Sequence, residues 1–143
     1  MRVTKIVPAL AALALISGSA YGSDDEECLK HLSGSGSMDS NCFMVAAADM
    51  ETANKALYTA IAQSIPKGNP NAALLSDYMR EQDRMKRFCT INKFAGSKWK
   101  PDITAPQVRN INDIAYFECI YDLRKDQNQH LQSILDLVKS TTN

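Results

Sequence analysis

The chain has 143 residues, the length of one ordinary domain, and its 16 basic side chains balance its 16 acidic ones. This balance argues against nucleic acid as a partner, because binding a phosphate backbone requires a clustered positive surface. Beyond residue 22 the sequence has no apolar segment approaching the roughly 20 residues that cross a bilayer. We therefore expect no stable membrane insertion.

The N-terminus has the layout of a cleavable secretory signal peptide. Arg2 and Lys5 precede an apolar stretch of 11 residues, 6–16, and small residues follow it. This stretch is too short to span a membrane. We expect cleavage after Gly22, with cleavage after Ala20 as the alternative. Loss of residues 1–22 leaves 14 basic and 16 acidic side chains, a net charge of −2, in the periplasm or outside the cell.

Four cysteines lie in the exported part: Cys28, Cys42, Cys89 and Cys119. An even number in a small exported chain predicts two disulfides. Zinc is disfavoured, because tetrahedral sites use close pairs such as C-x-x-C and 13 residues separate the nearest two cysteines here. We therefore predict no metal and no other cofactor. Three pairings are possible, and we favour Cys28–Cys42 with Cys89–Cys119, each of which joins neighbours along the chain.

Residues 23–41 are rich in acidic, Gly and Ser residues, which predicts a flexible arm ahead of a helical domain at 42–143. Apolar residues then recur every three or four positions from about 41 to 65, which indicates an amphipathic helix. Its expected apolar stripe consists of Cys42, Ala46, Met50, Ala53, Leu57, Ile61 and Ile65.

Two more helices are expected. Asn69 and Pro70 form a start signal for the second, which runs to about residue 91. Its stripe is Leu74, Tyr78, Met85, Phe88 and Cys89. Thr104 and Gln107 form a capping box for the third, which continues to about residue 140. Its stripe is Ile120, Leu123, Leu131, Ile134 and Val138. The sequence therefore predicts an all-α fold, a small antiparallel bundle of about three helices stapled by two disulfides.

The familiar signatures of catalysis are absent from the sequence. It contains no G-x-S-x-G elbow, H-E-x-x-H helix or P-loop. The acidic residues cluster in the arm or lie on expected helix faces away from the stripes, which is typical of solvated surfaces and not of acid–base pairs. We predict that the protein is not an enzyme.

Residues 92–104 are expected to form a loop with an unusual composition. It contains Phe94 and the only tryptophan, Trp99, which lies between Lys98 and Lys100. Trp99 either packs back onto the bundle or is an exposed anchor for a partner, since aromatic and basic residues dominate binding hot spots. In the second case Phe94, Lys98, Trp99 and Lys100 are the candidate partner-binding residues.

The order of residues around the cysteines follows a known pattern. Cys42 opens a helix that contains Ala53, Asn54 and Leu57, a basic-rich second helix ends at Cys89, and Cys119 precedes Leu123, Arg124 and Leu131. In these features residues 28–135 resemble the LprI-type lysozyme-inhibitor family, small exported helical proteins with four cysteines. That family usually has an aromatic residue and an Arg-Asp pair before its third cysteine, where this chain reads Arg84-Met85-Lys86-Arg87-Phe88, and a glycine pair in the next loop, reduced here to Gly96.

The resemblance implies an envelope or host-facing protein that inhibits a peptidoglycan-cleaving lysozyme. The leading hypothesis is therefore an exported inhibitor that binds another protein, a lysozyme-like hydrolase. The alternative is an exported helical interaction module, such as an immunity or adaptor protein. A third class, an enzyme or ligand carrier with an unrecognised site, stays open.

Overall fold

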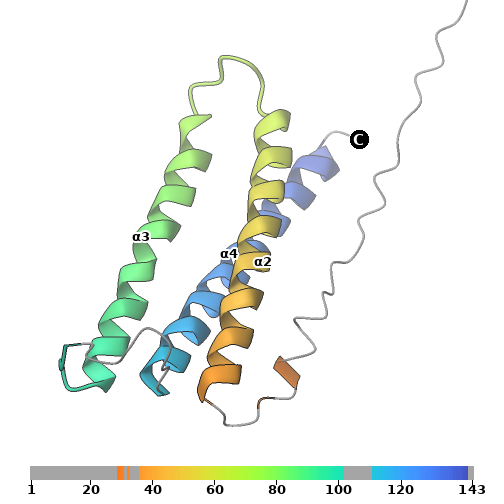
Figure 1. The fold of residues 1–143 in the computed structure, drawn as a ribbon. Helices are drawn as coiled ribbons and strands as arrows, with labels where there is room; N and C mark the ends of the chain where they lie inside the picture. Colours follow the sequence, from red (N-terminus) through yellow and green to blue (C-terminus); the bar gives the residue numbers. More distant parts are fainter. Residues whose placement is uncertain (1–28, 31, 33–35, 102–110, 142–143) are drawn as a thin grey trace, which may run out of the picture.

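A computed structural model of the protein describes residues 29–30, 32, 36–101 and 111–141. This part of the chain forms three long helices without any strand, α2 (Gly36–Ser64), α3 (Ala73–Gly96) and α4 (Ile111–Thr141), so the all-α prediction is confirmed (Figure 1). α3 runs antiparallel to α2 and α4. The predicted signal peptide lies outside the described residues, as do Thr104 and Gln107. None of the described helices is both long and apolar enough to cross a membrane.

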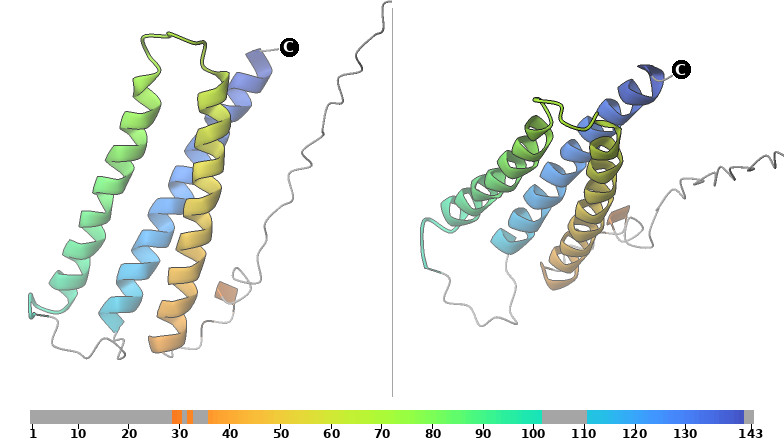
Figure 2. Two further views of the ribbon diagram at one scale, coloured as in Figure 1. Left: turned by 45° about the horizontal axis from the view of Figure 1, so that its top comes forward. Right: turned by 90° about the horizontal axis from the view of Figure 1, so that it is seen from above.

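α4 is the central helix of the bundle. It contacts both other helices, and its contact with α2 is much the larger (Figure 2). Phe43, Ala46 and Ala47 of α2 pack there against Tyr121 of α4, with the Phe43 and Tyr121 ring centroids 6.2 Å apart. The two small alanines allow the helices to approach closely, because the distance between helix axes depends on the side chains at the contact.

α2 and α3 begin at different residues from those that the sequence predicted. α2 begins at Gly36, so residues 36–41, which we expected in the flexible arm, belong to its first turns. Asp39 and Ser40 are buried there, and this burial outweighs the weak backbone preference of a Gly/Ser-rich segment. α3 begins at Ala73 instead of near Pro70, because the side-chain Oδ1 of Asn69 accepts from the Asn71 amide at 2.8 Å in a preceding turn.

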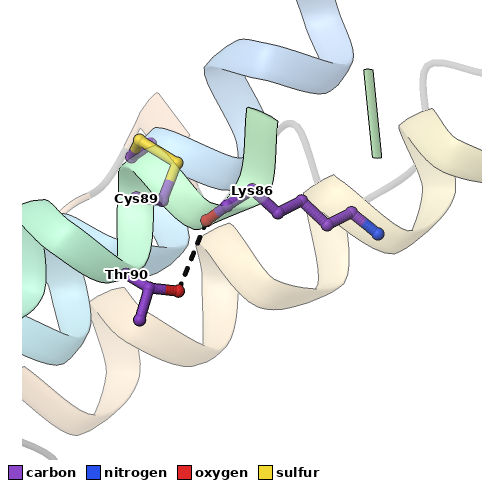
Figure 3. Close-up of a disulfide and its surroundings, with 4 residues drawn as sticks. Lys86, Cys89 and Thr90 are labelled. Carbon is purple, nitrogen blue, oxygen red and sulfur yellow. Dashed lines mark hydrogen bonds between the residues drawn. A yellow bond between two sulfur atoms is a disulfide. The ribbon is translucent and has the colours of Figure 1, made fainter. Parts of the chain in front are cut away.

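α3 is attached to the bundle in an unusual way, because its only buried residue is Cys89. Cys89 forms the predicted disulfide with Cys119 of α4, with a Cα–Cα distance of 5.6 Å. Cys28 lies outside the described residues, so the pair Cys28–Cys42 stays a prediction. Figure 3 shows Cys89 beside Lys86 and Thr90, with Lys86 extending away from the disulfide.

A buried polar cluster joins the three helices at mid-height. Arg124 of α4 donates through Nη1 to Gln127 Oε1 at 2.8 Å, and through Nη2 to Asp83 of α3 at 2.5 Å and Glu51 of α2 at 3.4 Å. Asn54 of α2 donates to the Arg124 carbonyl at 2.8 Å and to Gln127 Oε1 at 3.1 Å. At this level the facing sides of α2, α3 and α4 are therefore held together by polar contacts, although the sequence predicted apolar stripes there.

Candidate partner-binding site

The segment that follows α3 folds back onto the last turn of the helix. The backbone amide of Ser97 donates to Lys93 O at 3.2 Å, that of Lys98 to Ala95 O at 3.0 Å, and that of Trp99 to Phe94 O at 2.7 Å. The Ser97 hydroxyl also donates to Phe94 O at 2.9 Å. These bonds satisfy carbonyl groups that a helix end leaves without partners, so the segment 97–100 has a defined conformation.

Two consecutive residues in this segment adopt left-handed backbone angles. The φ angles are 56° at Lys98 and 60° at Trp99, and neither residue is glycine. Such a conformation costs roughly 1–2 kcal/mol per residue for an L-amino acid and persists only when the surrounding structure imposes it. Local strain of this kind is commonly found at ligand-binding segments.

Trp99 is 67% exposed. Lys98 and Lys100 are also exposed, whereas Phe94 is half-buried and belongs to α3 instead of the expected loop. The interpretation in which Trp99 packs back onto the bundle is therefore wrong. The structure brings Lys98, Trp99 and Lys100 together at the end of the bundle where α3 ends and α4 begins (Figure 1).

Three contacts fix the end of α3 against the start of α4. The Cys89–Cys119 disulfide is the first. Lys93 forms a largely buried ion pair with Asp113 at 2.8 Å. Gly96 lies so close to Asn112 that a Cβ at position 96 would be 2.7 Å from Asn112 Oδ1. The segment with Trp99 therefore leaves the helix from a firmly held position.

The neighbours of Trp99 in the sequence are basic. Lys98 and Lys100 are both exposed, whereas Lys86 and Lys93 within α3 are paired with carboxylates. Lys98 and Lys100 flank the exposed indole, so an acidic surface with an apolar depression would complement this segment in both charge and shape. Within the described residues no three His, Cys, Asp or Glu side chains come together as metal ligands would.

The central polar cluster was missed in the sequence. The apolar stripe expected for its helix contained Ala53 and not Asn54, but Asn54 is almost fully buried, while Ala53 is exposed. The spacing could have indicated this burial, because Asn54 lies four residues after Met50 and seven before Ile61, and residues at such intervals share one face of a helix.

The cluster contains two carboxyl groups whose pKa values are lowered. Hydrogen bonding by Arg124 lowers the pKa of Asp83, and hydrogen bonding by Lys55 lowers the pKa of Glu51.

Comparison of the chain with protein-family models, with curated proteins and with solved structures finds no match. The resemblance to the LprI-type lysozyme inhibitors therefore rests on the residues of this sequence alone.

Proposed function

We propose that the chain is an exported inhibitor that binds another protein, a lysozyme-like peptidoglycan hydrolase, through the segment Lys98-Trp99-Lys100. The observation that carries this proposal is the 67% exposure of Trp99 on a backbone held in the left-handed region. A large indole is costly to leave in water, and a fixed backbone reduces the ordering cost of binding.

Charge supports the choice of partner. Glycoside hydrolases place two carboxyl groups on either side of the bond they cleave, so their active-site clefts carry negative charge. Lys98 and Lys100 are adjacent in the sequence to the exposed Trp99, so the segment offers two cationic groups and one apolar group to such a cleft. The chain then blocks the cleft and performs no chemistry itself, in keeping with the prediction that it is not an enzyme.

The first test is binding by a Trp99→Ala variant. The oxidised exported protein should inhibit cell-wall lysis by at least one lysozyme-type hydrolase in a panel of host and bacterial enzymes. Trp99→Ala should raise the Kd by about 30-fold, or roughly 2 kcal/mol, the scale of a hot spot. Its melting temperature should hardly change, because exposed side chains contribute little to stability.

Leu74→Ala is the matched control, since Leu74 is 66% exposed on α3 at the opposite end of the bundle. It should bind and inhibit like the unsubstituted protein. Failure to inhibit any hydrolase in the panel would exclude the inhibitor. If another protein partner is then captured and Trp99→Ala releases it, the alternative of an immunity or adaptor module is correct.

Export makes a second prediction. The protein recovered from the envelope or medium should begin at Ser23, and peptide mapping without reduction should identify both Cys28–Cys42 and Cys89–Cys119. The absence of free cysteines among the described residues supports the first pair. An intact segment 1–22, or a different partner for Cys42, would contradict this part of the proposal.

A further inference from the structure

A groove lies at the end of the bundle opposite Trp99. At this end α3 and α4 diverge (Figure 1). The end of α2, the turn after it, the first turns of α3 and the last turns of α4 border this open groove, which has a volume of about 700 Å³. Its walls are mainly aliphatic: Ile61, Ile65, Leu74, Leu75, Ile134 and Val138. Among the residues that the structure describes, no acidic or basic side chain lines it.

The polar groups in the groove are mostly occupied within the protein. The Ser64 hydroxyl donates to Ile61 O at 2.6 Å, and Asn69 Oδ1 accepts from the Asn71 amide. The Thr141 hydroxyl is 3.0 Å from Val138 O, and the Tyr78 hydroxyl is hydrogen-bonded to His130 Nδ1 at 3.3 Å. Water in this groove therefore finds few partners, and an apolar molecule that displaces it gains free energy.

We propose that this groove binds an uncharged small molecule with an aliphatic body. The ligand should be uncharged, because an ionic group placed among these uncharged walls would lose part of its hydration without gaining a counter-charge. The volume lies within the roughly 300–1,000 Å³ that is usual for small-molecule sites.

A helix from a partner protein would place only one of its apolar faces in the open groove. Capture of such a partner without saturable binding of an uncharged small molecule would therefore overturn the proposal. A second copy of this chain is another competitor, because Leu74, which lines the groove, and Leu137, which is close in sequence to the lining residues of α4, are both exposed.

The test uses the oxidised exported protein and the uncharged fluorescent probe N-phenyl-1-naphthylamine. The probe should bind saturably at one per chain, and 1-decanol should displace it. Ile134→Trp, which fills the groove from a partly exposed position, should weaken probe binding by at least tenfold. Ile134→Ser, which removes apolar wall without adding bulk, should weaken it as well. Ile91→Trp is the matched control on the other half of α3 and should bind the probe normally, because Ile91 does not line the groove.

Sedimentation at the concentration of the binding experiment separates the competitor. A monomer that binds the probe with this pattern of variants supports the proposal. A dimer that Ile134→Trp converts to a monomer assigns the groove to a second copy and overturns it. Absence of saturable probe binding, or equal affinity in both Ile134 variants and the unsubstituted protein, overturns it too. The result does not depend on Trp99, so it can fail while the inhibitor proposal holds.

Discussion

Arg124 is 3% exposed, and the burial of a charged guanidinium requires hydrogen-bonding partners. Asp83 and Glu51 reach it from the two flanking helices, and Gln127 accepts from its Nη1. Among the described residues Nε has no hydrogen-bond partner. An incompletely satisfied buried cation is sensitive to the loss of either carboxylate, because the remaining hydrogen bonds cannot replace it.

Substitution of Asp83 by Asn should therefore destabilise the fold. We expect a loss of about 1.5 kcal/mol in the free energy of unfolding, the low end for a hydrogen bond to a charged group, because Asp83 is itself largely in water. Asp77→Asn is the control on the same helix, since Asp77 pairs with the exposed Arg80 and should contribute less than about 0.5 kcal/mol. Urea denaturation of both variants measures the difference. Equal losses would mean that Arg124 does not depend on Asp83.

α3 illustrates what a sequence pattern can and cannot predict about an element. The pattern located the helix and its disulfide, and Tyr78 and Cys89 do turn toward the bundle. Leu74, Met85 and Phe88 of the same predicted stripe are exposed. The face of α3 that turns toward the bundle is set by the disulfide at Cys89 and by the hydrogen bond between Asp83 and the buried Arg124. Arg124 lies 41 positions from Asp83 in the sequence, so periodicity within α3 could not predict this contact.

Because α3 buries only Cys89, its attachment should depend on the disulfide. The double variant Cys89→Ser and Cys119→Ser should lose about 3–4 kcal/mol, the chain-entropy value for a loop of this length. Hydrogen exchange should accelerate first in residues 73–96, while α2 and α4 keep their protection around Phe43 and Tyr121. Uniform acceleration across the three helices would instead mean that the bundle unfolds as one unit.

The whole molecule consists of a well-packed pair, α2 and α4, with α3 tied to it at separate points. These ties include, in order along α3, Tyr78–His130, Asp83–Arg124, Cys89–Cys119 and Lys93–Asp113, and Lys86 adds an ion pair to Glu51 of α2. The number and alternating direction of the helices follow from three amphipathic segments with short connections. The groove and the exposure of Trp99 do not follow from these segments. The groove depends on where the contacts between α3 and α4 end, and the exposure of Trp99 depends on the strained turn after Gly96.

Acid should lower the stability of the fold by protonating the carboxylates that contact Arg124. The ordinary pKa values are 3.8 for Asp83 and 4.5 for Glu51, and both are lowered in the folded protein, first by the hydrogen bonds from Arg124 and Lys55 respectively, with Lys86 adding to each. The unfolded chain therefore binds these protons more tightly than the folded one. The stabilisation that the two carboxylates provide is fully present above about pH 4.5 and is lost as the pH falls through the lowered values.

The measurement is the melting temperature as a function of pH for the unsubstituted protein and for the double variant Glu51→Gln and Asp83→Asn. The unsubstituted protein should lose stability steadily below pH 4.5. The variant should be less stable at pH 7 and should decline less steeply in acid, because it lacks the two groups whose protonation opposes folding. High salt should reduce the difference only partly, since Arg124 is shielded from solvent ions. Identical slopes in acid would show that other carboxylates control the acid stability and that the contacts of Arg124 with Asp83 and Glu51 do not.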